Sequence, residues 1–263
     1  MLTVVIEAVL MDFDKWRPWY DRIVHTFSFD RITDENSANF LERLIEGKAI
    51  HPSVVDRIIE GETIVVFGCG PSVERNLKEY LISQIRHRSI VIAADGATTP
   101  LLKIGLIVPR IVVTDLDGAV KDLLDAGRKG SIVTVHAHGD NINALESYVP
   151  KFDRVLGSTQ VEPRPHVYNF GGFTDGDRSV FLAEEAGAKR IILTGMDLGA
   201  IVGKYSKPGH TIDYPASPTK IKKLLIAKEL LTWLAGWADA EILNATGSGE
   251  EIEGVKDVVL SDV

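Results

Sequence analysis

The sequence predicts an α/β fold, with a Rossmann-like, mostly parallel sheet flanked by helices and a small helical N-terminal cap. From Thr63 onward, short β-branched runs alternate with helix-length amphipathic segments, a pattern typical of successive βαβ units. Residues 1–60 instead have the apolar spacing of helices. We therefore expect a helical cap over residues 1–60 and an α/β domain over residues 61–263.

Each part of the chain has a pattern that predicts its elements. In the cap, Trp16, Trp19 and Tyr20 cluster, and the apolar residues of segment 36–45 share one helical face. A loop rich in Gly, Pro, Lys and Ser precedes a strongly apolar helix, and the tail offers at most two short edge strands. The expected strands cover 63–67, 89–93, 111–114, 131–136 and 190–194, the loop 199–219, the helices 141–148, 179–186 and about 219–237, and the tail strands 241–244 and 255–260.

Composition narrows the classes of protein. A chain of 263 residues, 45% of them hydrophobic and 25% charged, can bury a large core. No apolar stretch approaches the length of a membrane span, and the start lacks a basic leader, so we expect a cytoplasmic protein. The single Cys69 excludes an internal disulfide, so any metal must bind oxygen or imidazole. The net charge of -8 argues against a general nucleic-acid coat.

Acidic residues or histidines follow five successive apolar runs. If the runs are parallel strands, these groups converge on the carboxyl edge of one sheet, where open α/β sheets bind ligands. That edge suits a metal and a polyphosphate. The segments are Ala93–Gly96, Val113–Gly118, Val135–Asn141, Phe173–Asp177 and Thr194–Asp197.

The segment Gly68-Cys69-Gly70-Pro71-Ser72 follows the first expected strand and opens a helix. Gly68, Gly70 and Ser72 are candidates for contacts with phosphate or ribose, although a tight turn without a ligand has the same pattern. Val73 stands where a dinucleotide-binding fingerprint has its third glycine, which disfavours a dehydrogenase even though Asp95 lies near the position of a ribose-binding acid. We expect Cys69 to be a packed residue rather than a nucleophile.

Asp115 and Asp117 give the strongest metal signal. Both side chains can face the strand end if the backbone bends at Leu116-Asp117-Gly118, and two hard oxygen ligands suit Mg²⁺. A turn or a solubilising pair is the alternative. Asp95 and Gly96 end the neighbouring run and offer a further ligand at the same edge.

The segment 136–141 is the densest polar group. His136 and His138 can face one pocket only if the strand ends before His138. Asp140 and Asn141 are candidates for ligand contact, although Asp140 could instead cap the helix that follows. We favour contact with phosphate or a leaving group over zinc, because the usual helical histidine spacing is absent.

Two further segments contribute candidates. Asp175, Asp177 and Arg178 suit an anion or hydroxyl site, whereas a helix cap and a surface ion pair are the alternatives. Asp197 lies at the same edge or in a turn. The loop with Lys204, Lys207 and His210 could close over a triphosphate or remain a solvated loop.

These motifs together carry a resemblance over about residues 60–200. Ala94-Asp95-Gly96-Ala97, Thr114–Gly118 and Phe173–Asp175 are similar to blocks of thiamine pyrophosphokinases. Gly68–Ser72, His136–Asn141 and Gly171–Arg178 resemble more closely the archaeal 6-hydroxymethyl-7,8-dihydropterin pyrophosphokinase family, which shares a domain with flagellar accessory factors. Gly118 stands where the thiamine enzymes have Ser, and those enzymes have no equivalent of segment 136–141.

The resemblance implies that residues 61–263 form a pyrophosphokinase-like catalytic domain. The expected reaction moves the β,γ-diphosphoryl group of ATP to the hydroxymethyl of a reduced pterin and releases AMP, in folate-type or tetrahydromethanopterin biosynthesis. It requires Mg²⁺. The partners are then ATP and the pterin, without nucleic acid or membrane, and a homodimer is left open. The expected catalytic residues are Asp115, Asp117 and Asp175. The expected metal ligands are Asp95, Asp115 and Asp117. The expected ligand-binding residues are Gly68, Gly70, Ser72, Asp95, Gly96, His136, His138, Asp140, Asn141, Asp177, Arg178, Lys204 and Lys207.

Three alternatives stay open. A thiamine pyrophosphokinase would use the same edge for another acceptor. A nucleotide-sugar glycosyltransferase could use Asp115 and Asp117 to hold a metal-bound diphosphate. A non-catalytic nucleotide-binding module would bind ATP and release no AMP.

Overall fold

The structure, a computed structural model, describes residues 11–263. The first ten residues, on which the expectation of a cytoplasmic location rests in part, lie outside the described residues. Among those described, no helix combines the length and apolar character that crossing a membrane demands.

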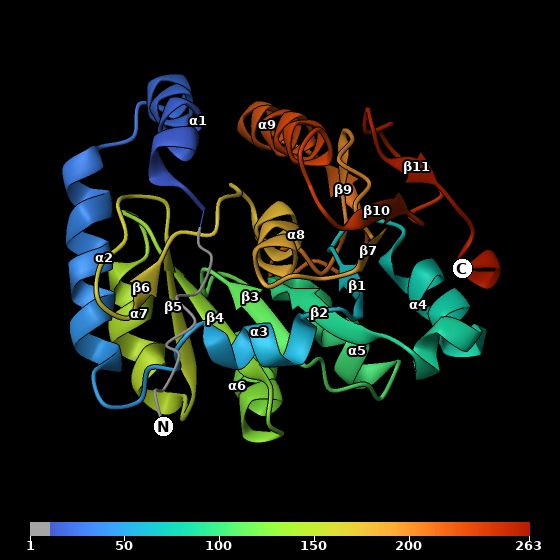
Figure 1. The fold of residues 1–263 in the computed structure, drawn as a ribbon, viewed down its shortest axis with the longest axis horizontal. Coiled ribbons are helices and arrows are strands. Elements are labelled where there is room, and N and C mark those ends of the chain that lie inside the picture. Colours follow the sequence, from blue (N-terminus) through green and yellow to red (C-terminus); the bar gives the residue numbers. More distant parts are fainter. Residues whose placement is uncertain (1–10) are drawn as a thin grey trace, which may run out of the picture.

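A nine-stranded sheet forms the centre of the molecule (Figure 1). All of its neighbouring strands pair in parallel, in the order β11-β10-β7-β1-β2-β3-β4-β5-β6. The predicted α/β fold class is therefore confirmed. The strands are β1 (Thr63–Phe67), β2 (Ile90–Ala94), β3 (Ile111–Thr114), β4 (Ile132–Ala137), β5 (Val155–Thr159), β6 (Val167–Tyr168), β7 (Arg190–Thr194), β10 (Glu241–Asn244) and β11 (Lys256–Asp257).

Helices cover both faces of the sheet, as buried parallel strands require. Helix α8 packs over β1, β2 and β3, and α2 packs over β4 and β5. A short antiparallel pair, β8 (Ile201–Val202) and β9 (Tyr214–Pro215), lies within the loop that the sequence places before the last long helix. The α-helices are α1 (Phe13–Phe27), α2 (Arg31–Ile45), α3 (Ser53–Ile59), α4 (Val73–Ile82), α5 (Thr98–Lys103), α6 (Val120–Arg128), α7 (Ile142–Tyr148), α8 (Asp175–Glu185) and α9 (Pro218–Ala235).

Local sequence explains where the helices above the site begin. Asp30 caps α2 by accepting a hydrogen bond of 3.1 Å from the backbone nitrogen of Ile32. Ser217 caps α9 in the same way through Lys220, with Pro218 at the first helical position, where a missing N–H costs nothing. These two caps fix the ends of α2 and α9 that face the carboxyl edge of the sheet.

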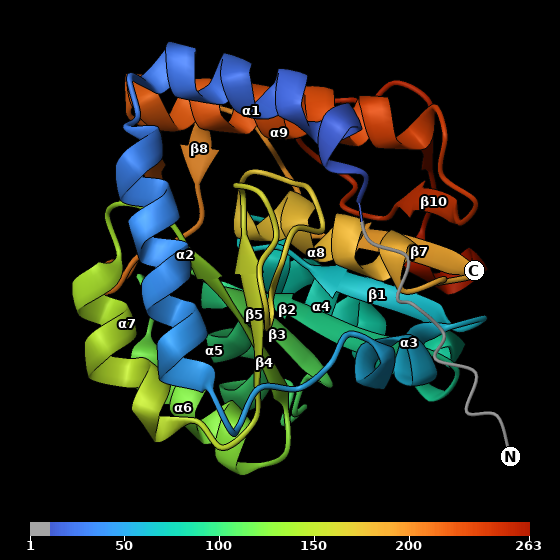
Figure 2. The ribbon, with the colours of Figure 1, turned by 60° about the vertical axis from the view of Figure 1, so that its left-hand side comes forward.

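The N-terminal helices share one hydrophobic core with the α/β part, in which Trp16 and Leu41 are buried with the strands. Helices α1 and α9 lie side by side in both views (Figures 1 and 2). Trp19 and Trp233 join them with ring centroids 5.7 Å apart, and Arg22 pairs with Glu229 at 2.6 Å. The helical cap thus reaches over the carboxyl edge of the sheet and takes part in the site.

Candidate active site

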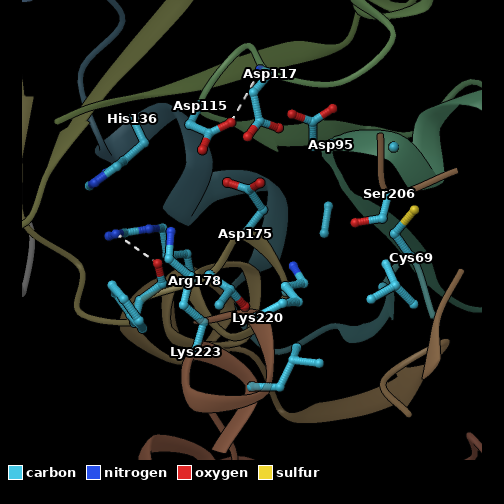
Figure 3. A pocket seen from close by; sticks show the side chains of 18 of the residues that line it. Cys69, Asp95, Asp115, Asp117, His136, Asp175, Arg178, Ser206, Lys220 and Lys223 are labelled. Atoms are coloured by element: carbon cyan, nitrogen blue, oxygen red, sulfur yellow. Dashed lines mark hydrogen bonds between the residues drawn. The ribbon is translucent and has the colours of Figure 1, made fainter. Parts of the chain in front are cut away.

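A cavity of about 510 Å³ opens at the carboxyl ends of β1 to β5 (Figure 3). The strand order places the segments that follow β1, β2, β3 and β4 next to one another along this edge. Helices α8 and α9 and the turn between α1 and α2 line the rest of the cavity. The predicted convergence of polar groups at this edge therefore occurs.

Three carboxylates form a compact cluster in the cavity. One oxygen each of Asp95, Asp115 and Asp117 lies within 4.8 Å of the others. Thr114 Oγ1 donates a hydrogen bond of 2.8 Å to Asp95 Oδ2, whereas the buried Asp95 Oδ1 has no hydrogen-bond partner within residues 11–263. An unpartnered buried oxygen among three hard oxygen donors fits a divalent cation such as Mg²⁺.

The backbone is bent where these carboxylates are presented. Leu116 has φ 70° and Asp95 has φ 34°, both in the region that non-glycine residues rarely adopt. The bend at Leu116 is the one that the sequence required for Asp115 and Asp117 to share a site. A Cβ on Gly118 would lie 1.7 Å from Asp95 Oδ1, so the Ser of the thiamine enzymes does not fit here with Asp95 in this position.

The electrostatics of the cluster follow from burial and mutual repulsion. Burial and the neighbouring Asp115 raise the pKa of Asp95 to about 7. Burial also acts to raise the pKa of Asp115, but its hydrogen bond to His138 and the charge of that ring hold this pKa below its usual range. Desolvation, followed by Asp115 and Asp95, raises the pKa of Asp175 well above its ordinary value. A bound cation would relieve this repulsion.

Asp175 reaches the cluster from a helix and not from a strand end. The predicted convergence assumed that the run before it is a strand, but β6 ends at Tyr168 and α8 begins at Asp175, so that assumption does not hold here. Gly171 and Gly172 have φ of 85° and 80°, which an extended strand cannot accommodate. Because α8 lies across β1 to β3, its first residue faces the carboxylates that follow β2 and β3.

Both histidines line the cavity because β4 ends at Ala137, before His138. Their rings are stacked with centroids 6.0 Å apart. His138 Nε2 lies 3.5 Å from Asp115 Oδ2, and His136 Nδ1 lies 3.2 Å from Ser158 Oγ. Within residues 11–263, the metal-type cluster consists of the carboxylates of Asp95, Asp115 and Asp117, and carboxylates are ligands that suit a hard cation.

The glycine-rich turn lines the cavity with its amides already engaged. Gly68 and Gly70 donate to the carbonyl oxygens of Thr194 and Gly195 at 2.7 and 2.8 Å. Ser72 lies outside the cavity lining and donates through its hydroxyl to Asp197 Oδ2 at 2.8 Å. A Cβ at Gly70 would lie 2.0 Å from that oxygen. The two glycines thus allow the loops after β1 and β7 to cross closely.

Asn141 and Asp177 shape the site from outside its lining. The Asn141 side chain donates to the carbonyl oxygens of Asp115 and His136 at 3.0 and 2.7 Å and so holds their two loops together. Asp177 accepts hydrogen bonds from the backbone nitrogens of Phe173 and Thr174 at 2.6 and 2.8 Å, which is the helix-capping alternative. Both residues position neighbours rather than facing the cavity.

The remaining candidates divide between the cavity and its surroundings. Gly96, Arg178 and Lys207 line the cavity, and Lys207 contacts the carboxylate of Asp117. Asp140 is exposed at the cavity rim, and Asn141, not Asp140, is the residue before α7. Lys204 pairs with Glu74 at 2.9 Å outside the lining, and the His210 ring stacks on Tyr214.

Several lining residues were missed from the sequence. Lys220 and Lys223 face the cavity from the first turns of α9, and their spacing of three residues, which places them on one helical face, was the available signal. Asp34, Phe29 and Gln160 come from the cap and from the end of β5. Nothing in their local sequence pattern places them at the carboxyl edge.

Comparisons with known proteins agree with the motifs. Residues 38–203 match the family described as 6-hydroxymethylpterin diphosphokinase MptE-like. The 6-hydroxymethyl-7,8-dihydropterin pyrophosphokinase of Pyrococcus furiosus is 46% identical over 235 residues, covering 89% of this chain and 98% of the relative. The enzymes of the same name from Methanothermobacter thermautotrophicus and Methanocaldococcus jannaschii are 43% and 42% identical, covering 99% and 100% of those relatives.

A solved structure shares the fold. The MAf glycosyltransferase from Magnetospirillum magneticum superposes with a TM-score of 0.55 at 14% identity, over 86% of this chain and 39% of that one. At this identity the likeness concerns the fold alone. From the match over residues 38–203 and the three archaeal relatives, the chain belongs to the MptE-like 6-hydroxymethylpterin diphosphokinase family.

Proposed function

We propose that this protein is a 6-hydroxymethyl-7,8-dihydropterin pyrophosphokinase that uses ATP as the diphosphoryl donor and Mg²⁺ as the metal. The archaeal relatives that it matches over nearly their whole length carry this name. The observation that supports the chemistry is the cluster of Asp95, Asp115 and Asp117 beside the cavity lysines.

The transfer forms a bond between the hydroxymethyl oxygen of the pterin and the β-phosphorus of ATP. The bond from that phosphorus to the oxygen bridging the α- and β-phosphates breaks, and AMP leaves with the electron pair. Asp95, Asp115 and Asp117 would hold a divalent cation, which when bound neutralises charge on the phosphate oxygens. Lys220 and Lys223 line the same cavity and supply positive charge from the side opposite the cluster, whereas Lys207 supplies it directly beside Asp117.

The hydroxymethyl group must lose its proton during the transfer. Asp175 lines the cavity beside the acidic cluster, and its raised pKa makes its carboxylate a stronger base than an exposed aspartate. We assign it the role of accepting this proton. The Lys207 side chain, which meets Asp117 from the loop between β8 and β9, would cover the phosphates and exclude water.

The nucleotide product tests this function. With ATP, Mg²⁺ and 6-hydroxymethyl-7,8-dihydropterin, we expect one AMP for each diphosphorylated pterin, as measured by chromatography, and little AMP when the pterin is omitted. ADP formed in proportion to a monophosphorylated pterin would make the protein an ordinary kinase. Asp115→Asn is the matched inactive variant, because Asp115 contributes to the cluster and approaches His138.

A further inference from the structure

The strand order gives the cavity two ends with different chemistry. Cys69 follows β1, Asp95 follows β2, Asp115 follows β3, and His136 lies near the end of β4. Adjacent strands are about 4.8 Å apart, so three steps separate the first and last of these segments by roughly 14 Å. Figure 3 shows the same order, with the carboxylates between Cys69 and Ser206 at one end and His136 and Arg178 at the other.

At the β4 end, two buried side chains each have one nitrogen that forms a hydrogen bond and another that forms none with the described residues. Arg178 Nη2 donates to the Phe173 carbonyl at 3.0 Å and to Gln160 Oε1 at 3.3 Å, whereas Nη1 is buried and has no partner among the residues that the structure describes. His136 Nδ1 forms a hydrogen bond with Ser158 Oγ, whereas Nε2 is buried and has no partner in the described part of the chain. Both residues line the cavity and are only 5% and 1% exposed.

Unpartnered buried nitrogens are costly unless a ligand completes their hydrogen bonds. A network of hydrogen bonds around Gln160 fixes the position of the Arg178 side chain. The side chain of Gln160, which accepts a hydrogen bond from Arg178, donates through Nε2 to Asp34 Oδ2 at 2.8 Å. The backbone carbonyl of Gln160 accepts a hydrogen bond of 2.8 Å from Trp16 Nε1. Tyr20 donates to the same Asp34 oxygen at 2.9 Å. The N-terminal helices therefore build this end of the cavity.

An aromatic wall completes the β4 end. Phe29 and Phe173 line the cavity, and Phe27 packs against both with centroid distances of 5.3 and 5.4 Å. Lys223 Nζ lies 5.8 and 5.7 Å from the ring centres of Phe29 and Phe173. Flat apolar faces beside fixed polar groups suit a planar heterocycle.

Resting on the proposed function, we infer that the pterin ring binds at the β4 end of the cavity, where Arg178 Nη1 and His136 Nε2 read its polar edge, and that the nucleotide lies toward β1. A pterin has a carbonyl oxygen beside a ring N–H, and a guanidinium can donate to that oxygen. Adenine has no carbonyl oxygen. The acidic cluster between the two ends then lies where the phosphates must pass from one substrate to the other.

The opposite end suits a nucleoside. Cys69 and Ser206 lie there, together with Met196, Ile201 and Val202 from the segments after β7. This end also contains the glycine-rich turn. A nucleoside placed there would extend its phosphates over the carboxylates toward Lys207.

A pair of substitutions at one histidine gives a sharp test. His136→Asn keeps an amide near Nδ1 to meet Ser158 and removes the group at Nε2, whereas His136→Gln can place its amide near Nε2. The probe is fluorescent 6-hydroxymethylpterin, titrated in the presence of Mg²⁺ and α,β-methylene-ATP. We expect His136→Asn and Arg178→Lys each to raise the pterin Kd about tenfold, the cost of one lost buried hydrogen bond. His136→Gln should recover most of the loss.

The same variants should change the affinity for the pterin but not the affinity for the nucleotide. Calorimetry with α,β-methylene-ATP should give a nucleotide Kd within about twofold of wild type for the two β4-end variants, His136→Asn and Arg178→Lys. Ser206→Phe, which fills the other end, should raise the nucleotide Kd and leave the pterin Kd unchanged. His87→Asn and Arg88→Lys make the same exchanges at exposed positions and control for the chemistry of substitution. Thermal unfolding establishes that each variant is folded.

The outcomes separate the two proposals. If the wild type makes diphosphorylated pterin but the β4-end variants keep the wild-type pterin Kd, the placement of the pterin is wrong and the proposed function stands. A rise in nucleotide Kd alone for these variants would reverse the two ends and also overturn the inference. If the wild type neither binds nor converts the pterin, the proposed function itself fails.

Discussion

Asp95 and Thr114 join the ends of two neighbouring strands, β2 and β3, through a hydrogen bond of 2.8 Å. The bond occupies one carboxylate oxygen of Asp95, and the other is buried beside Asp115 and Asp117 with no hydrogen-bond partner in the part of the chain that the structure describes. Such an oxygen is unfavourable without a cation or a proton. The raised pKa of Asp95, about 7, has the same origin.

The acidic cluster predicts a metal requirement. Activity should need Mg²⁺ or Mn²⁺, and Asp117→Asn should lower kcat about 100-fold, the size of the loss when one preorganised electrostatic group is removed. Because the pKa of Asp95 is about 7, protons should compete with the cation, and the apparent Mg²⁺ affinity should weaken as the pH falls through that value. Magnesium titrations of initial rate at several pH values measure both effects.

Asp125→Asn is the control, since Asp125 forms an exposed pair with Lys129 on α6. It should leave the rate unchanged. Full activity of the wild type in excess chelator would contradict the metal assignment.

Gly118→Ala should weaken metal binding without a large loss of stability. The backbone of Gly118 needs no positive φ, but its Cβ would collide with Asp95 Oδ1 at 1.7 Å. Asp95 must then move, and we expect the apparent Mg²⁺ affinity to fall about tenfold. Gly236→Ala, where the nearest atom is 3.3 Å away, is the matched control. Equal Mg²⁺ affinity in the Gly118 variant and the wild type would show that Asp95 is not a ligand.

Sequence patterns predicted the five strands that carry long β-branched runs, because strands buried on both faces need such runs. Strand β5, with Gly157, Ser158 and Thr159, lacks the run and was missed, although it is buried. The acidic cluster was also predictable, because only the bend at Leu116 and the parallel pairing of β2 with β3 bring its three carboxylates together. Periodicity therefore located most of the sheet and the metal-type end of the site.

The other parts of the site depend on contacts across long stretches of chain. Asp34 meets Gln160 across 126 residues, and the hydroxyl of Ser72 meets Asp197 across 125. A local pattern cannot distinguish Asp177, which caps its helix, from Asp175 two residues earlier, which faces the cavity. Only the tertiary packing of α8 separates these two roles.

The buried charge of Arg178 predicts the choice of acceptor. A neutral pterin can accept its hydrogen bond, whereas the cationic thiazolium of thiamine would meet a buried cation and leave Nη1 and His136 Nε2 unpartnered. We expect kcat/KM for 6-hydroxymethyl-7,8-dihydropterin to exceed that for thiamine by about 10⁴, as in sites that reject ligands lacking the required hydrogen bonds. Parallel assays of AMP release with the two acceptors measure this ratio, and a ratio below one would make the protein a thiamine enzyme.

Because Glu185 has a raised pKa and lies outside the candidate active site, we expect it to make the stability of the fold depend on pH independently of catalysis. Burial and the adjacent Glu184 raise its pKa to about 8 in the folded protein, against an ordinary value of 4.5. The folded state therefore holds this proton more tightly than the unfolded state, and the resulting stability, complete below pH 4.5, is lost as the pH rises toward 8. Glu185→Gln keeps the side chain neutral at every pH, so its Tm should match the wild type near pH 4 and exceed it by a margin that grows up to pH 8. Calorimetric scans across this range test it, with the exposed Glu146→Gln as control. A Tm difference that stays constant with pH would mean that Glu185 is ionised in the folded protein.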